Sequence, residues 1–320
     1  MRLGTNALSL LVVPLNVHVL DALAEERLPL ADLSRAIGHP PATTTRSHLR
    51  TLTERGIISR EREAEFPGAV SYSITPSGRG MLSVVEVVRR WLGSAPDGPL
   101  TLGGTGAKSA IKALLDGWST GLMRALAARP FCLTELSRLL PQTSYPTLER
   151  RLTAMRRVGL LQAQRKGSSR GTPYEITPWL RQGVAPLSAA GHWEQRFAPR
   201  QAEPVGKVDV EAMFLLAIPL LQPPSSLSGS CRLAVEMKSG SDFQFAGVTA
   251  SFEAGHLLTC VTQLGGEPDA WATGSALDWV SSMSGHGQRL QIGGDPDLAA
   301  SVIDGLRASL AAESPVGGGP

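Results

Sequence analysis

Two stretches of the chain place arginine, threonine and serine side chains on the outward face of a predicted helix. An arginine guanidinium can form two hydrogen bonds with a guanine edge, and a threonine methyl group can contact a thymine methyl group. Hydroxyl groups and the amides that begin a helix suit phosphate oxygens. The predicted contact residues are Thr43, Thr44, Arg46, Ser47 and Arg50 in the first stretch and Thr147, Arg150, Arg151 and Thr153 in the second. This chemistry suits double-stranded DNA.

Each of these helices is followed by a predicted hairpin that carries further charge. The first hairpin alternates arginine and glutamate and is nearly neutral, whereas the tip of the second is purely basic. The candidate phosphate contacts are Arg62 in the first hairpin and Arg165, Lys166 and Arg170 in the second. We therefore expect the second unit to contribute more of the phosphate contact.

The charge of the whole chain is unevenly distributed. The formal net charge of +3 is made up of +1 over residues 1–100, +10 over residues 101–200 and −8 over residues 201–320. A strongly basic segment is typical of a polyanion-binding surface, and an acidic one is not. The middle of the chain is therefore the predicted DNA-binding part, and the acidic end is expected to have a different role.

Both helices belong to an internal repeat. At an offset of 103, residues 22–62 align with residues 125–165 with 11 identities in 41 positions, where typical residue frequencies would give roughly three. The match resumes at an offset of 102, where the pattern Tyr-x-Ile-Thr-Pro occurs at 72–76 and at 174–178. The apolar run over 8–20 resembles a secretion signal. Since the segment beside it recurs in mid-chain, we interpret the run as a helix of the first repeat.

Each repeat is predicted to fold as three helices, a hairpin and a closing helix. In the first repeat the pattern predicts helices over 8–20, 30–37, 43–55 and 81–92, with threonines 43 to 45 as a possible N-cap. Strand character at 57–58 and 70–74 predicts the hairpin. The stripes expected to be buried are Thr45, Leu49 and Leu52 in the first repeat and Leu148, Leu152 and Met155 in the second. Two helices joined by a tight turn and followed by a hairpin are typical of a winged helix-turn-helix.

The repeats are separated by a stretch rich in glycine and proline. We place the first repeat at 1–93, the linker at 94–108 and the second repeat at 109–200. The run 103–109 superficially resembles a phosphate-binding loop, but Ala107 stands where that loop needs glycine. A linker is the better interpretation.

Several short motifs resemble those of HxlR-type winged-helix regulators. They are the run 117–126, the run 131–138 that ends in Glu-Leu-Ser-Arg, the two Tyr-x-Ile-Thr-Pro patterns, and the late tryptophans Trp91 and Trp193. The resemblance implies a bacterial transcription factor that binds DNA, usually with one such domain per chain in a homodimer. This chain carries two copies, which suggests a covalent pseudo-dimer and leaves a further homodimer open. The three scattered cysteines favour a reducing compartment, so we expect a cytoplasmic protein.

The acidic segment at 205–313 has a different pattern, with strands alternating with helices, and is predicted to be an α+β domain. The runs 268–279 and 290–296 resemble those of sterol-carrier-protein domains, which implies a pocket for a small apolar effector. The predicted pocket residues are Phe214, Phe243, Phe245, Trp271, Trp279 and Met283. The predicted fold is therefore mainly α with α+β: two tandem winged-helix domains followed by a sterol-carrier-like α+β domain.

The sequence offers little for catalysis. The three cysteines and six histidines do not fall at metal-ligand spacing, and no Gly-x-Ser-x-Gly motif occurs. We therefore predict no catalytic residues, no metal, no cofactor and no membrane partner. Two alternatives remain: an apolar-ligand carrier whose winged helices bind proteins, and, less favoured, a winged-helix DNA glycosylase that uses Gln162 and Gln164.

Overall fold

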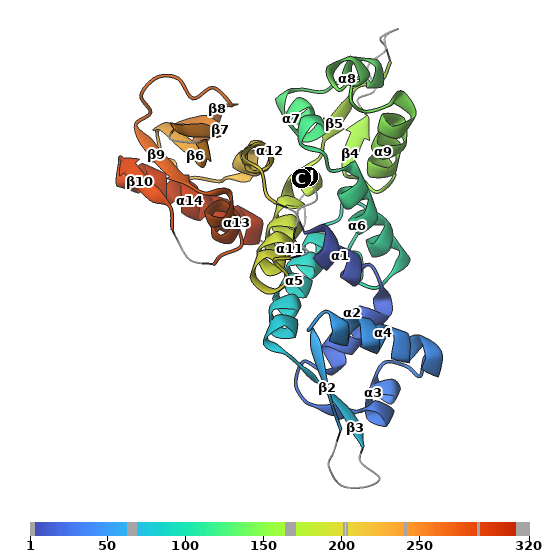
Figure 1. Cartoon of the computed structure of the whole chain (residues 1–320). Coiled ribbons are helices and arrows are strands. Elements are labelled where there is room, and N and C mark those ends of the chain that lie inside the picture. The colour runs from blue at the N-terminus through green and yellow to red at the C-terminus, as the bar shows by residue number, and fades with distance from the viewer. Residues whose placement is uncertain are drawn as a thin grey trace.

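The computed structural model describes residues 4–62, 69–163, 171–200, 202, 204–239, 242–286 and 289–311, without the side chains of 237–239 and 242–243. The first part of the chain is a helical unit with a small sheet of order β1-β3-β2 (Figure 1). Its elements are α1 (Thr5–Leu11), α2 (Pro14–Ala22), β1 (Leu28–Pro29), α3 (Leu30–Ala36), α4 (Ala42–Glu54), β2 (Ile58–Arg62), β3 (Val70–Ile74) and α5 (Pro76–Gly93).

The structure corrects three expected boundaries in this unit. The predicted first helix is two helices, α1 and α2, bent by 84°, because Pro14 lacks the amide that would continue α1. Helix α4 begins at Ala42, after Pro41, and no threonine caps it; Thr45 is instead buried and donates to the Pro41 carbonyl at 3.3 Å. Helix α5 begins five residues earlier than expected, because the Thr75 hydroxyl accepts a hydrogen bond from the Gly78 amide.

A similar order of elements follows in the middle of the chain, except that no strand of the described residues corresponds to β1 and two helices stand in place of α5. These elements are α6 (Thr105–Gly117), α7 (Thr120–Ala128), α8 (Leu133–Leu139), α9 (Tyr145–Arg157), β4 (Leu161–Ala163), β5 (Tyr174–Ile176), α10 (Pro178–Gln182) and α11 (Val184–Phe197). Helix α6 begins inside the expected linker, and the expected closing helix is divided at Gly183 into α10 and α11.

Local contacts also recur at the repeat offsets. The Leu28–Tyr72 strand pairing has its counterpart in the isolated bridge between Phe131 and Tyr174. The Thr75 hydroxyl donates to the Gly56 and Ile57 carbonyls, and the Thr177 hydroxyl donates to those of Gly159 and Leu160. Gly56 follows α4 and Gly159 follows α9, and both have positive φ, of 68° and 81°.

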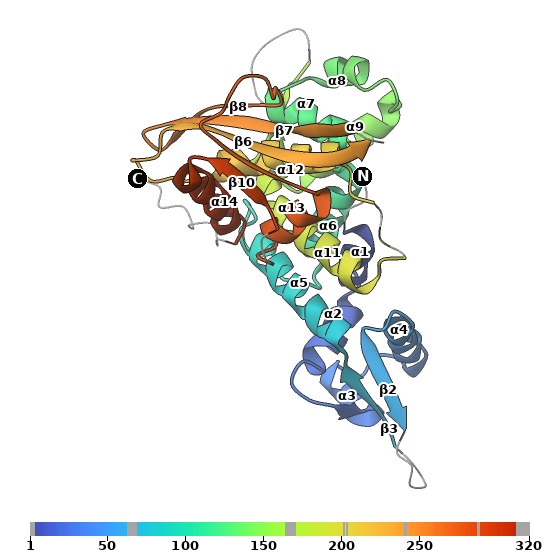
Figure 2. The ribbon, with the colours of Figure 1, turned by 60° about the vertical axis from the view of Figure 1, so that its left-hand side comes forward.

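The last part of the chain is a five-stranded sheet of order β10-β9-β6-β7-β8, with helices packed on one face (Figure 2). Its elements are α12 (Lys207–Ala217), a 3-10 turn (Ile218–Leu220), β6 (Gly229–Ser239), β7 (Asp242–Glu253), β8 (His256–Val261), β9 (Ala270–Gly274), α13 (Ala276–Met283), β10 (Gln291–Gly294) and α14 (Pro296–Ala311). Strand β9 was not expected from the sequence. It pairs in parallel with β6, and antiparallel with β10.

Helices α5 and α11 pack against each other and join the first two parts of the chain. The Trp91 and Trp179 rings stack with 4.8 Å between their centroids, and each indole nitrogen donates to the backbone carbonyl of the other residue, at 3.1 and 2.7 Å. The Trp193 indole donates to the Ser77 carbonyl at 2.8 Å. Within the described residues no single helix is long and apolar enough to span a membrane; the bent pair α1 and α2 meets that test only as a pair.

We predict that Trp91→Phe and Trp193→Phe each lower the free energy of unfolding by about 1–3 kcal/mol, because each leaves a carbonyl at this contact without its donor. Urea denaturation of the full chain measures the change. Trp271→Phe is the matched control, since Trp271 is 36% exposed, and it should change the free energy by less than about 0.5 kcal/mol. Equal losses in all three variants would contradict this account of the contact.

Candidate nucleic-acid interface

Helix α4 presents its predicted contact residues to solvent. Thr45, Leu49 and Leu52 are buried, as expected, and they orient the helix. The residues exposed on the opposite face are Thr43, Thr44, Arg46, Ser47 and Arg50. Arg50 forms only an exposed, 3.8 Å ion pair with Glu54, which costs little to break. This face of α4 is therefore open to a partner.

Helix α9 is more enclosed than α4. Leu148, Leu152 and Met155 are buried beneath it. Arg150 is exposed, whereas Thr147, Arg151 and Thr153 are partly buried, and the Thr147 hydroxyl accepts a hydrogen bond from Ser144 at 2.9 Å. Helix α6 packs along one flank of α9. The two predicted reading helices are thus equivalent in position but not in surroundings.

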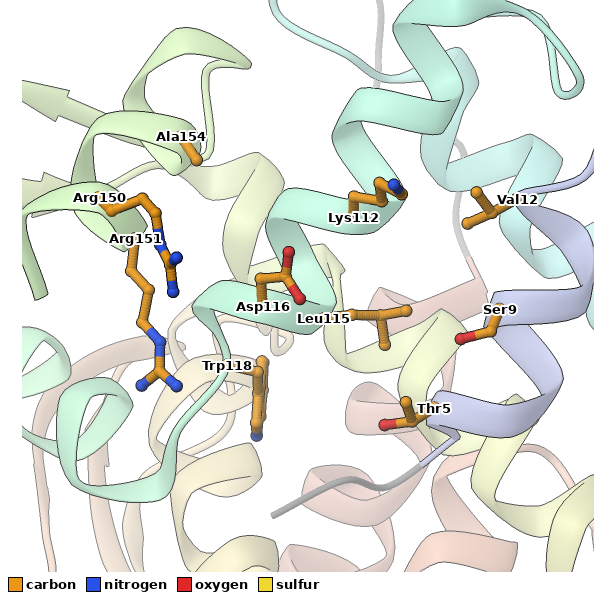
Figure 3. A pocket seen from close by; sticks show the side chains of 10 residues that line it. All are labelled: Thr5, Ser9, Val12, Lys112, Leu115, Asp116, Trp118, Arg150, Arg151 and Ala154. Carbon is orange, nitrogen blue, oxygen red and sulfur yellow. The ribbon is translucent and has the colours of Figure 1, made fainter. Parts of the chain in front are cut away.

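A cleft opens beside α9, with α6 between α9 and α1 (Figure 3). Its volume is about 790 Å³. Arg150 and Arg151 extend from α9 into it, toward the side where Asp116 and Trp118 lie, and Lys112 stands on α6 (Figure 3). Arg150 and Arg151 therefore belong to two surfaces, the reading helix and this cleft.

Of the predicted hairpin contacts, Arg62 lies within the described residues. Arg62 is exposed at the end of β2 and is paired in register with Val70. Arg165, Lys166 and Arg170 lie outside the described residues, as does Gln164. Gln162 is described, and its side chain donates to Glu175 on the neighbouring strand at 3.1 Å, which is an ordinary cross-strand contact.

Helices α4 and α9 lie on the same side of the molecule, with α1 and α6 between them, and the two views agree (Figures 1 and 2). The C-terminal sheet lies on the other side (Figure 1), where helix α12 of the same domain packs on α7 and helix α13 packs on α11. It therefore leaves the outer face of α4 uncovered.

The predicted apolar-pocket residues fall into two groups. Phe214 and Trp279 are buried and meet edge to face, with 4.7 Å between ring centroids, and Met283 is buried in the same core. Phe245 and Trp271 are exposed on the outer face of the sheet, at 50% and 36%. The side chain of Phe243 lies outside the described residues. The structure thus brings together three of the six residues and separates two.

The described part of the chain was predicted to hold no metal ligands or reactive thiols. It holds no group of three or more His, Cys, Asp or Glu side chains that could bind a metal ion. Burial raises the pKa of the Cys231 and Cys260 thiols to about 12. These two cysteines are therefore uncharged thiols and poor nucleophiles at neutral pH.

The family comparison agrees with the first unit. The family model of the HxlR-like helix-turn-helix matches residues 15–97, from α2 to just beyond α5. Over these residues the chain is similar to an HxlR-like helix-turn-helix domain. Such a domain indicates a DNA-binding transcription regulator. No curated protein shows significant similarity to the chain.

Two features near these surfaces were not predicted from the sequence. The first is the cleft, because no sequence motif predicts that Lys112 and Trp118 lie near Arg151. The second is a stacked pair of imidazoles, His192 on α11 and His286 after α13, with 4.1 Å between ring centroids. His192 Nδ1 also lies 3.1 Å from the Ser281 hydroxyl. These contacts join the C-terminal sheet unit to α11.

We predict that acid weakens this junction. Burial, followed by the nearby His286 and Arg196, lowers the pKa of His192 from 6.5 to about 4. Between about pH 6.5 and 4 the unfolded chain then binds more protons at this residue than the folded chain does, so stability falls as the pH falls. Urea midpoints at pH 7 and pH 5 measure the change, which should be smaller in His192→Gln. His18→Gln, at an exposed site on α2, should behave like the wild type; an unchanged pH dependence in His192→Gln would refute the assignment.

Proposed function

We propose that the chain is a DNA-binding transcription regulator in which two winged helix-turn-helix units act as a covalent pseudo-dimer on one operator. The observation that carries the proposal is the reciprocity of the contact that α5 makes with α10 and α11. At the repeat offset of 102, Trp91 corresponds to Trp193 and Ser77 corresponds to Trp179. Trp91 donates to the Trp179 carbonyl, and Trp193 donates to the Ser77 carbonyl. In a twofold dimer, residue i contacts j and j contacts i in the same way, and this pair of bonds follows that rule.

The placement of the helices supports binding of a single duplex. Helices α4 and α9 lie on one side of the molecule (Figures 1 and 2). Paired reading helices of this type enter successive major grooves about 34 Å apart. Because the outward residues of α4 and α9 differ, the operator should be an imperfect inverted repeat.

Individual roles follow from exposure. Arg46 and Arg50 on α4 and Arg150 on α9 are exposed on the reading faces, so we assign them to base edges. Arg151 is partly buried and is better placed for the DNA backbone. Thr43, Thr44, Ser47, Thr147 and Thr153 are assigned to methyl or phosphate contacts, and the hairpin arginines and lysine to phosphates.

We assign the C-terminal domain to regulation. Its helix α12 packs on α7, where the Arg124 guanidinium lies 2.7 Å from the buried Glu211 carboxylate and the Thr120 hydroxyl donates to Asp209. A small apolar effector in the core around Phe214, Trp279 and Met283 would shift α12 and, with it, the second reading unit. Such coupling requires the effector to have different affinities for the two states. An acidic domain placed away from α4 supports this role over direct DNA contact.

We predict that Arg150→Ala with Arg151→Ala weakens operator binding far more than Arg60→Ala with Arg62→Ala. Loss of the Arg150 base contact should cost about 1–3 kcal/mol, and loss of Arg151 removes a backbone contact as well, whereas Arg60 and Arg62 lie on a nearly neutral hairpin. Gel-shift assays with salt titration, on a duplex selected from random sequence, measure both the affinity and the slope. Arg35→Ala, on the exposed face of α3, is the control. Equal losses in the two double variants would contradict the asymmetry.

The same assay separates the alternative function. A regulator needs a steep negative dependence of log affinity on log salt and a preference for one sequence. A wild-type chain that selects no sequence and shows no salt dependence would overturn the proposal in favour of a carrier with protein-binding winged helices.

A further inference from the structure

The cleft between α1, α6 and α9 has the volume of a small-molecule site. Its volume of about 790 Å³ lies within the range of ligand pockets, roughly 300–1,000 Å³. Helix α1 comes from the first repeat, whereas α6 and α9 belong to the second (Figure 3). A ligand held here would touch both halves of the chain.

The charged groups of the cleft have no partners within the described part of the chain. Lys112, Arg150 and Arg151 line it together with one carboxylate, Asp116. None of these four side chains forms an ion pair or a hydrogen bond with another described residue. Three cations and one anion leave an excess of two positive charges on a concave surface, where fields are focused. The cleft therefore favours an anion.

An apolar wall accompanies these charges. Trp118 is 5% exposed, Val12 is 9% exposed, and Leu115 is partly buried beside them. A nucleic-acid phosphate would leave this wall unused. The combination suits a ligand with an aromatic or aliphatic body and an acidic group.

The first repeat lacks these cations at the corresponding positions. At the offset of 103, Arg150 corresponds to Ser47 and Arg151 corresponds to His48. His48 Nδ1 lies 3.0 Å from the Asn16 side-chain oxygen, so its ring is already bonded within its own unit. The cationic cleft is thus a feature of the second unit and not of the shared fold.

We propose that this cleft binds a small organic anion, a carboxylate, sulfonate or phosphate monoester with an apolar body, and that the bound anion competes with DNA for Arg150 and Arg151. The competition with DNA rests on the proposed function, whereas the binding of the anion does not. Because linkage is reciprocal, a ligand that weakens DNA binding must be weakened by DNA to the same extent.

The binding arm uses 8-anilinonaphthalene-1-sulfonate, a fluorescent organic anion, with the full chain. We expect saturable binding that Lys112→Met weakens about tenfold, through the loss of one charge-assisted hydrogen bond. Ser9→Trp, which fills the cleft from an exposed position on α1, should abolish the signal. N-phenyl-1-naphthylamine has the same rings without the sulfonate and should bind at least about tenfold more weakly.

The control variant tests whether the dye binds elsewhere. Leu258→Ser removes a side chain that is 59% exposed on the C-terminal sheet and should leave the affinity unchanged. The proposed site would be overturned if the wild type showed no saturable binding, or if Lys112→Met and Ser9→Trp bound the dye as tightly as the wild type does. It would also be overturned if the uncharged dye bound as tightly as the sulfonate, or if Leu258→Ser lost binding.

The competition arm measures DNA affinity with and without saturating dye. The wild type should bind the duplex at least several-fold more weakly with dye, whereas Ser9→Trp should bind it equally with and without dye. Dye that occupies the cleft without changing DNA affinity would overturn the competition. A wild-type chain that binds the dye at the cleft but binds no duplex would instead overturn the proposed function and leave the site standing.

Discussion

The packing of α5 against α11 is the constraint on which the rest of the arrangement depends. Helix α5 follows the first hairpin, and α10 and α11 follow the second, so the contact fixes both reading units relative to each other. Beside this contact, Trp91 on α5 stacks against Trp179 on α10, and both rings are buried at 3% exposure. Buried indole N–H groups need acceptors, and backbone carbonyls from the opposite unit supply them. Few other orientations of the two helices would satisfy these donors.

Helix α11 is also where the third part of the chain attaches. It packs against α5, α1 and α13, and the Ala7 amide donates to the buried Glu194 carboxylate at 2.8 Å. The small residues Ala189, Ala190 and Gly191 allow these neighbours to approach closely. One helix thus connects the first unit, the second unit and the C-terminal sheet, which gives a physical route by which events at the sheet could reach the reading helices.

The sequence predicted helices α4 and α9 and their buried stripes because local patterns determine them. Helices α4 and α9 begin and end at positions that are 103 residues apart. Their apolar stripes are buried, as the helical spacing indicates. Strand β9 was missed because Ala270–Gly274 has no clear alternation, and only its pairing with β6 makes it a strand. The break at Pro14 was missed although it has a local cause, because a proline inside a helical pattern ends or kinks the helix. The break at Gly183, whose backbone lies close to Leu114 on α6, depends on packing. The cleft could not be predicted, since Lys112 and Arg151 are brought together by the tertiary contact of α6 with α9.

The central claim is that one chain places two reading helices on one duplex, and a hydroxyl-radical footprint at a measured stoichiometry tests it most directly. The chain is titrated onto a duplex selected from random sequence, and the chain-to-duplex ratio is measured at saturation. The account predicts one chain per duplex and two protected patches on the same face, about 34 Å apart. A single protected patch per chain, or a second patch that appears only when a second chain binds, would contradict it.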